Sequence, residues 1–102
     1  MIRTRTISME VNKMVGDTFD SLLELFPKFT EGYINRANVK RSMGKLEEAL
    51  TDYNKAIELD PNHIEGFNNR GSLFQKLNQH DKAIEDYEKA LRLNKRLIDP
   101  RF

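Results

Sequence analysis

A 34-residue repeat dominates this sequence, because residues 30–63 and 64–97 can be aligned without a gap. Chance alone would make roughly two of the paired residues identical. The identical pairs are in fact Glu31/Glu65, Gly32/Gly66, Asn35/Asn69, Arg36/Arg70, Ala49/Ala83, Asp52/Asp86, Tyr53/Tyr87, Lys55/Lys89, Ala56/Ala90 and Leu59/Leu93. A fixed period of this length indicates one supersecondary unit used at least twice, in which neither copy can bury its apolar face alone. The chain should therefore fold as a stack of similar units.

Each copy contains two stretches in which apolar residues recur at helical spacing. In the first copy, Thr30 is placed to cap a helix that Gly44 ends. A second helix is predicted from Glu47 until Asp60 and Pro61 stop it. Because the turn between these helices is short, the two should form an antiparallel hairpin.

The second copy repeats this plan. Asn62 and Glu65 resemble a capping box before the third helix, and Asn78 suits a left-handed cap at its end. The fourth helix should open at Asp81 and run to about Asn94, or on to Ile98. Its predicted buried stripe consists of Ala83, Ile84, Tyr87, Ala90, Leu91 and Leu93.

Small residues recur where two helices would approach closely, at the pairs Ala37/Gly71, Ala49/Ala83 and Ala56/Ala90. With its aromatic residues and proline included, the sequence closely resembles the tetratricopeptide repeat (TPR) family. The first copy matches the family pattern at Tyr33, Ala37, Ala49, Tyr53, Ala56 and Pro61, and the second at Phe67, Gly71, Phe74, Ala83, Tyr87 and Ala90. It departs from the pattern at Arg36 and Arg70, where the family often has leucine, at Lys40 for an aromatic residue and at Lys95 for the closing proline.

The resemblance implies an all-α, TPR-type superhelix of stacked antiparallel helical hairpins. Residues 30–63 and 64–97 are the two full repeats, and residues 98–102 are a C-terminal tail. Residues 17–29 are predicted to be the helix of a partial earlier repeat, because it has apolar residues and a proline near the expected places: Phe19, Leu22, Leu23, Leu25 and Pro27. Residues 1–16 are predicted to be an N-terminal tail or a short degenerate helix.

Composition narrows the classes of function. The chain has 17 Lys and Arg against 16 Asp and Glu, so no strong field favours nucleic acid or an anionic membrane surface. It contains no cysteine, which fits the reducing compartment of a cytoplasmic protein. Residues 1–16 lack the apolar run of a secretory signal or a membrane span, and they read as a loose tail or as an organelle-targeting segment.

No group of residues predicts catalysis. A nucleophile, base or metal set that converges on a pocket is not evident, and neither is a Gly-rich phosphate loop. His63 and His80 each stand alone in a turn and are predicted to be solvated surface histidines. The expectation is therefore a protein that is not an enzyme and that uses neither a cofactor nor a metal.

A concave groove is the remaining candidate site, because stacked hairpins curve and their first helices line the inner face. The resemblance places Glu31, Ile34, Ser42, Glu65 and Gln75 on this face, together with the predicted groove residues Asn35, Asn38, Arg41, Asn68, Asn69, Ser72 and Lys76. Asn35 and Asn69 can clamp the backbone of an extended peptide, since an amide both donates and accepts hydrogen bonds.

Other interpretations of these residues stay open. Asn35 and Asn69 can instead bond neighbouring helices or water. Arg41 and Lys76 are either anion contacts or part of a solvated charged face. Some TPR proteins bind acidic C-terminal tails through a cationic clamp, but Glu31 and Glu65 occupy positions of that clamp, so this activity is not predicted.

Two functions follow from the sequence. The first is a protein–protein interaction module, a scaffold or adaptor, that binds a peptide segment of a partner in the groove. The alternative is a self-assembling homo-oligomer or a fragment of a longer array, because solenoids generally need about three repeats. In that case the side of the last helix that carries Ala83, Tyr87 and Leu91 would be open unless Leu97, Ile98 and Phe102 fold back over it.

Overall fold

Five helices form the part of the chain that the structure describes. The computed structural model describes the backbone of residues 3–98 and the side chains of residues 14–95. The helices are α1 (Arg3–Leu25), α2 (Thr30–Ser42), α3 (Leu46–Leu59), α4 (Ile64–Lys76) and α5 (His80–Ile98), and these described residues form no strand. The predicted all-α class is therefore confirmed.

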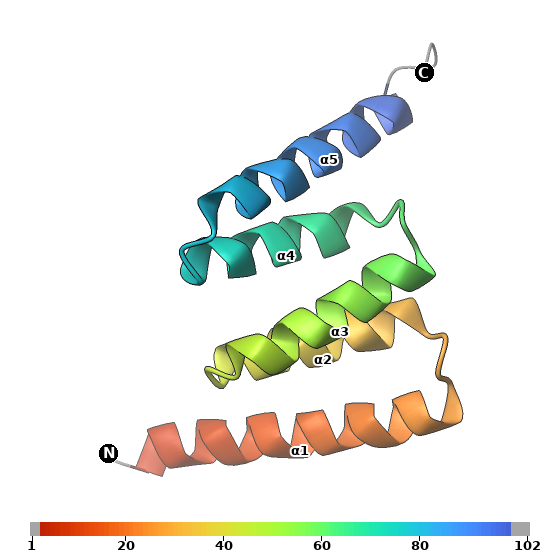
Figure 1. Cartoon of the computed structure of the whole chain (residues 1–102). Helices are drawn as coiled ribbons and strands as arrows, with labels where there is room; N and C mark the ends of the chain where they lie inside the picture. Colours follow the sequence, from red (N-terminus) through yellow and green to blue (C-terminus); the bar gives the residue numbers. More distant parts are fainter. Residues whose placement is uncertain (1–2, 99–102) are drawn as a thin grey trace.

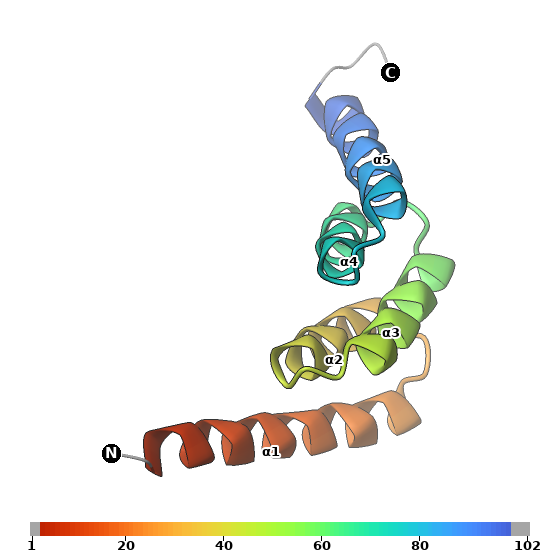
Figure 2. The same ribbon diagram turned by 60° about the vertical axis from the view of Figure 1, so that its left-hand side comes forward.

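The helices pair and stack as the repeat predicts (Figure 1). The α2–α3 and α4–α5 hairpins are antiparallel, and α1 packs against α2 at one end of the stack. Turning the molecule shows α2 and α4 on one side of the stack and α3 and α5 on the other (Figure 2). The result is an elongated molecule of 53 × 33 × 22 Å in which each hairpin contacts only its neighbours.

The first helix of each hairpin ends as the sequence predicts. Gly44 has φ of +80° and Asn78 has φ of +60°, the left-handed conformation that glycine and asparagine tolerate best. The predicted N-terminal caps, in contrast, are wrong. Phe29 occupies the cap position of α2, so Thr30 is its first residue, and α4 is capped by the His63 side chain rather than by an Asn62/Glu65 box.

Small side chains lie where the helices cross, as predicted. Ala37, Ala49 and Ala56 are fully buried between α2 and α3. A Cβ atom added to Gly71 on α4 would come within 3.0 Å of the Tyr87 ring and 3.3 Å of the Ala83 carbonyl oxygen on α5. Contacts this short are tighter than most real Cβ contacts, so glycine lets α4 and α5 approach each other here without displacing Tyr87.

Helix α1 is longer than the partial helix predicted for residues 17–29, and it passes through residue 16 without a break. In the repeats, a residue with positive φ separates the two helices of a hairpin, namely Gly44 and Asn78. The equivalent position 34 residues before Gly44 is Glu10, which rarely adopts this conformation. The turn is therefore missing, and a single helix replaces the hairpin.

The prediction for the open side of the last helix is confirmed at Leu91 and wrong at Ala83. Ala83 is buried against α4, so it does not lie on an open side. Ile84 and Leu91 were assigned to the buried stripe, but 54% and 60% of their surfaces are exposed. The alternative that the C-terminal residues cover this helix concerns the side chains of Leu97, Ile98 and Phe102, which lie outside the described residues.

An arginine–aspartate pair joins the two helices of each hairpin. Arg36 on α2 donates through Nε and Nη2 to both carboxylate oxygens of Asp52 on α3, at 2.8 and 2.7 Å. Arg70 on α4 binds Asp86 on α5 with the same two distances. Both aspartates are buried, and the hydrogen bonds from Arg36 to Asp52 hold the pKa of Arg36 well above its usual range, although burial opposes this.

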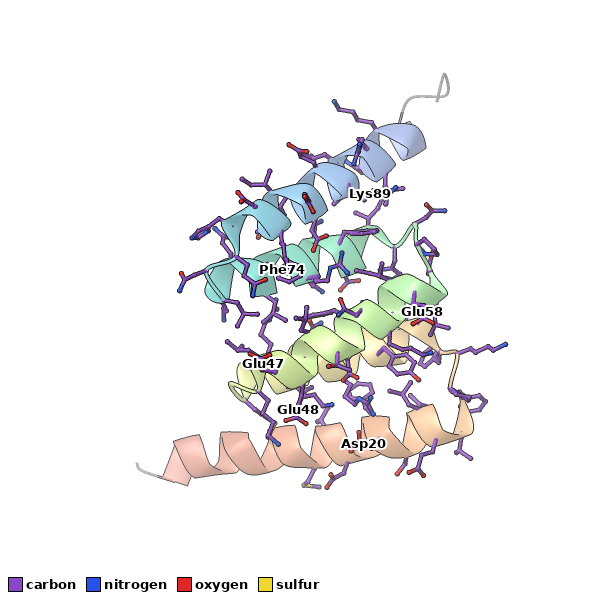
Figure 3. The ribbon with its side chains drawn as sticks, viewed as in Figure 1. Asp20, Glu47, Glu48, Glu58, Phe74 and Lys89 are labelled. Carbon is purple, nitrogen blue, oxygen red and sulfur yellow. The ribbon has the colours of Figure 1, made fainter. Side chains whose placement is uncertain are left out.

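The same arginines also reach the preceding helix. Nη1 of Arg36 donates to Asp20 on α1 at 2.8 Å, and Figure 3 shows Asp20 on that helix. Nη1 of Arg70 donates to Asn54 on α3 at 3.0 Å. Each guanidinium group therefore ties three helices together, and we call this series of contacts the arginine ladder.

Breaking one side of the ladder should be costly. Arg70→Met leaves the Asp86 carboxylate buried without its partner, so we expect a loss of about 3–5 kcal/mol in the free energy of unfolding. The double variant Arg70→Met/Asp86→Leu removes the stranded charge and should recover most of this loss. Chemical denaturation followed by circular dichroism measures both.

The matched control for this prediction is the exposed pair Lys55–Glu58 on α3, whose charged atoms lie 3.9 Å apart. Lys55→Met should change the free energy of unfolding by less than about 1 kcal/mol. Equal losses in the Lys55 and Arg70 variants would contradict a structural role for the ladder.

Candidate functional site

The predicted groove residues lie on two helices that contact each other. Arg41 spans them, because its Nη1 donates to the carbonyl oxygen of Asn69 at 3.5 Å. The structure leaves Asn35, Asn68 and Lys76 exposed and half-buries Asn38, Arg41, Asn69 and Ser72. Ile34, which the resemblance placed on the inner face, is instead completely buried in the core, so it cannot line a groove.

Asn38 is held by a residue of the opposite helix. The Tyr53 hydroxyl on α3 donates to the side-chain oxygen of Asn38 on α2. Tyr53 is itself fully buried. Burial raises the pKa of Tyr53, the nearby charge of Arg41 opposes the increase and that of Glu65 adds to it. Asn38 thus has a structural role beside any role in binding.

The repeated asparagines behave differently from Asn38. Within the part of the chain that the structure describes, the amide groups of Asn35 and Asn69 form no hydrogen bond with another residue. The interpretation that these two amides bond neighbouring helices therefore has no support among the described contacts. Both can instead exchange hydrogen bonds with water or with a ligand.

His63 is not the solvated histidine that the sequence predicted. Its ring is half-buried, and Nδ1 accepts a hydrogen bond from the backbone N–H of Gly66 at 2.9 Å, which caps α4. Its Nε2 atom contacts a carboxylate oxygen of Glu31 on α2. His63 therefore links the start of α4 to the start of α2. His80, in contrast, is exposed at the start of α5, as predicted.

Glu31, His63 and Glu65 were not grouped by any sequence pattern, but the structure brings their side-chain ligand atoms within 4.8 Å of one another. The equivalence of Glu31 and Glu65 was the one available signal. A neutral imidazole has one N–H, so a ring that accepts at Nδ1 must carry its proton on Nε2. In this tautomer His63 donates to Glu31 and offers a metal no lone pair, so His63 caps α4 and binds Glu31 while Glu65 lies close by.

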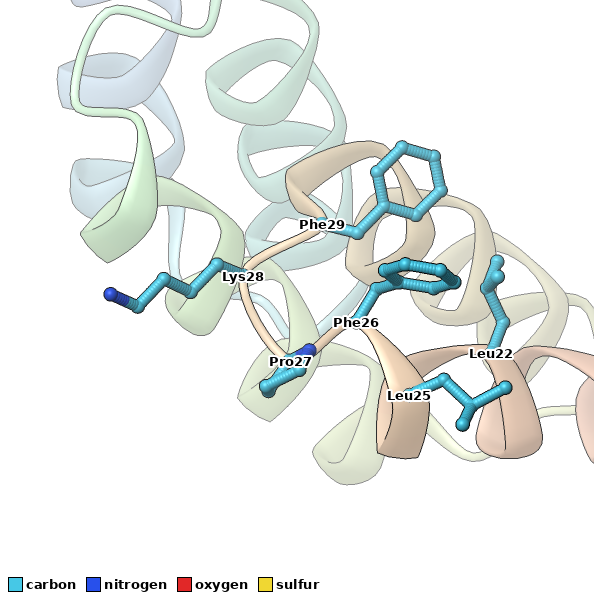
Figure 4. A pocket seen from close by; sticks show the side chains of 6 residues that line it. All are labelled: Leu22, Leu25, Phe26, Pro27, Lys28 and Phe29. Carbon is cyan, nitrogen blue, oxygen red and sulfur yellow. The ribbon is translucent and has the colours of Figure 1, made fainter.

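An apolar cavity that the sequence did not predict lies beside the turn between α1 and α2 (Figure 4). Its volume is about 590 Å³, and it is lined by Leu22, Leu25, Phe26, Pro27, Lys28 and Phe29. Leu25 and Phe26 expose 74% and 59% of their surfaces. A patch of exposed large apolar side chains is characteristic of surfaces that bind other molecules.

In the described part of the chain, no helix is both long enough and apolar enough to span a bilayer.

Comparison with known families agrees with the repeat. A family model described as "TPR repeat" matches residues 37–78, and one described as "Tetratricopeptide repeat" matches residues 64–97. Together the two matches extend from Ala37 to Leu97. No curated protein matches the sequence of the chain.

Several solved structures share the fold. The chain resembles a crystal structure of MamA with a TM-score of 0.84 at 20% identity, and it covers 56% of that protein. It resembles YrrB, described as a TPR protein with an unusual peptide-binding site, with a TM-score of 0.73 at 32% identity; the match covers 76% of this chain and 40% of YrrB. The match to MamA covers 93% of this chain. The chain thus spans about half the length of the structures that it matches first.

A further similar structure contains a ligand. The second TPR domain of Spaghetti (RPAP3), solved with the HSP90 peptide SRMEEVD, has a TM-score of 0.77 and 26% identity. The match covers 80% of this chain and 76% of that domain.

The raised pKa of Tyr53 predicts a loss of stability in alkali. The folded chain retains the neutral phenol more strongly than the unfolded chain does, so the free energy of unfolding should fall as the pH rises above about 10, the ordinary pKa of tyrosine. Tyr53→Phe should cost about 0.5–1.5 kcal/mol at pH 8 for the lost hydrogen bond. The difference in the free energy of unfolding between variant and wild type should be smaller at pH 11 than at pH 8 in denaturation experiments. A constant difference would contradict the prediction.

Proposed function

Because the chain belongs to the tetratricopeptide repeat family, we propose that it is a protein–protein interaction module, a scaffold or adaptor, that binds an extended peptide segment of a partner on the α2/α4 face. We define this face by Asn35, Asn38, Arg41, Asn68, Asn69, Ser72 and Lys76. The structures of YrrB and of the RPAP3 domain support the proposal, since their descriptions name a peptide-binding site and a bound peptide.

The observation that carries this proposal is the state of the two repeated amides. Asn35 and Asn69 occupy the same position of adjacent repeats, on helices that contact each other. Neither amide is used by the described contacts, whereas Asn38 and Asn54 are held by Tyr53 and Arg70. An extended peptide presents backbone N–H and C=O groups, and a primary amide can pair with both.

The charges of this face favour some peptides over others. Arg41 and Lys76 are cationic, but Glu31 and Glu65 lie near His63 at the starts of the same two helices. A peptide that is uniformly acidic would meet these two carboxylates. The face therefore suits a peptide with an acidic group opposite Arg41 and a neutral or basic group opposite Glu31 and Glu65.

Removing the two amides should weaken peptide binding. We expect Asn35→Ala/Asn69→Ala to raise the Kd of peptides selected from a random library about tenfold, because each lost hydrogen bond contributes about 0.5–1.5 kcal/mol. Isothermal titration calorimetry measures the Kd, and circular dichroism should show unchanged helicity. The matched control is Asn62→Ala/Asn94→Ala, which removes two exposed amides outside this face. Equal affinities for all three proteins would refute the proposal.

Self-assembly is the alternative function, and the exposed apolar residues at the two ends of the stack favour it. Leu25 is the last residue of α1 and Phe26 follows it, and Ile84 and Leu91 lie on α5. A homo-oligomer would cover one of these surfaces with another copy.

Sedimentation tests this alternative. If copies associate through α1, the mean mass should rise with concentration in the wild type, and Leu25→Lys should abolish the rise because it places a charge in the interface. Leu91→Lys tests the other end in the same way. A monomer at every concentration would exclude self-assembly.

A further inference from the structure

Helix α5 exposes a face that the repeat normally covers. We call Ile84, Glu88 and Leu91 the outer face of α5; all three are exposed. They follow Leu50, Asn54 and Ile57 of α3 by one repeat. On α3, helix α4 packs beside the corresponding face, where Leu50 and Ile57 are half-buried and Asn54 stays exposed.

The contact between α3 and α4 has two specific parts. Gly66 of α4 lies against Ile57, so that an added Cβ atom would be 3.4 Å from its Cγ1 atom. Four residues later, Arg70 donates to the side-chain oxygen of Asn54 at 3.0 Å. The acceptor precedes the aliphatic residue by one helical turn on α3.

The contact between α1 and α2 has the same two parts. An added Cβ atom on Gly32 would lie 2.8 Å from the Leu23 side chain, so glycine lets the covering helix approach without displacing Leu23. Arg36, again four residues later, donates to Asp20 at 2.8 Å. Two interfaces therefore follow one rule. The covering helix carries Gly-x-x-x-Arg. On the covered helix, the arginine binds an oxygen acceptor, and the glycine lies against an aliphatic residue three positions after that acceptor.

Helix α5 carries the receiving half of this arrangement, because Glu88 and Leu91 occupy the positions of Asp20 and Leu23 and of Asn54 and Ile57. The chain does not reverse direction after the equivalent residue of α5, as it does between α3 and α4. The α3 helix ends at Leu59, just before Pro61, whereas α5 has Lys95 at the position of Pro61 and continues as a helix to Ile98. The described chain therefore places no helix on the outer face of α5.

We propose that the outer face of α5 binds a helix of a partner protein, and that this helix carries the sequence Gly-x-x-x-Arg. The glycine lies against Leu91 and lets the two helices approach closely, while the arginine donates to the carboxylate of Glu88. Because Glu88 is charged, its hydrogen bond with the partner's arginine is stronger than the bond of Arg70 with the neutral Asn54. Docking here extends the stack by one helix and leaves the α2/α4 face open.

A second copy of the chain is a poor occupant of this face. The sequence contains five glycines, of which only Gly32 and Gly66 are followed four positions later by arginine. Both belong to helices that already cover α1 and α3. A copy would have to unpack its own core to offer either of them, so a second copy of the described residues does not supply this helix.

A peptide of residues 62–78 of this chain is the probe, because it contains Gly66 and Arg70 and represents the helix that covers the equivalent face of α3. With Asn68→Lys and Ser72→Asp, a lactam bridge between positions 68 and 72 keeps it helical. We expect one peptide to bind each chain, with Glu88→Arg weakening the binding about tenfold as attraction becomes repulsion. The peptide with Arg70→Glu should bind the wild type weakly and should regain affinity for the Glu88→Arg variant.

Two variants act as controls in the same titration. Glu85→Arg reverses a charge on α5 at the position of Thr51, which is exposed and hydrogen-bonds to Glu47 of its own helix, so it should leave the affinity unchanged. Leu91→Lys should abolish binding without changing the circular dichroism spectrum, because Leu91 is already exposed.

Three results would overturn the proposal. The first is a helical peptide that does not bind. The second is binding that ignores Glu88→Arg, since a peptide that merely replaces the internal α4 would not sense Glu88. The third is self-association of the chain that Leu91→Lys abolishes. In that case a second copy would occupy the outer face of α5.

Discussion

The bidentate pair of an arginine on one helix with a buried aspartate on the next is the interaction on which the stack depends. Burying either carboxylate alone would be strongly unfavourable, so Asp52 and Asp86 fix where α2 and α4 must lie. The remaining guanidinium nitrogen then binds the previous helix and sets the spacing between hairpins. Apolar contacts fill the space around these pairs, with Arg70 also lying 5.6 Å from the ring centres of Phe67 and Phe74.

The sequence could predict the helices and their order because the 34-residue period constrains them strongly. Small residues at Ala56 and Gly71 and turn residues at Gly44 and Asn78 each have one structural reason, so their positions in the fold followed directly. The ladder was missed although its signal was present. Arg36, Asp52 and their equivalents are identical in both repeats and 16 residues apart, but a charged residue at a leucine position was treated as a departure from the family pattern.

Side-chain roles in the candidate site were less predictable, because they depend on contacts between helices that are distant in sequence. His63 looked isolated, yet its partner Glu31 lies 32 residues earlier, where the stacking of two hairpins brings it close. The helical period of the sequence allows Ile34 to lie either on the inner face or in the core. Only the packing of α2 against its neighbours decides between these two positions. Asn35, Asn38 and Asn69 have the same chemistry, so only the position of Tyr53 separates the held amide from the other two.

The two ends of the stack are open for different reasons. On α1, Val15 and Leu22 stand where the repeats have Ala49 and Ala56, so a helix cannot approach α1 as closely as α2 approaches α3. Thr18 stands at the position of Asp52 and donates to the carbonyl oxygen of Met14, so the carboxylate that binds arginine in the repeats is absent at this position of α1. Helix α5 keeps both an acidic acceptor and an aliphatic residue at the required spacing. The N-terminal end is thus a bulky apolar surface, whereas the C-terminal end retains the geometry and the charge with which the repeat receives another helix.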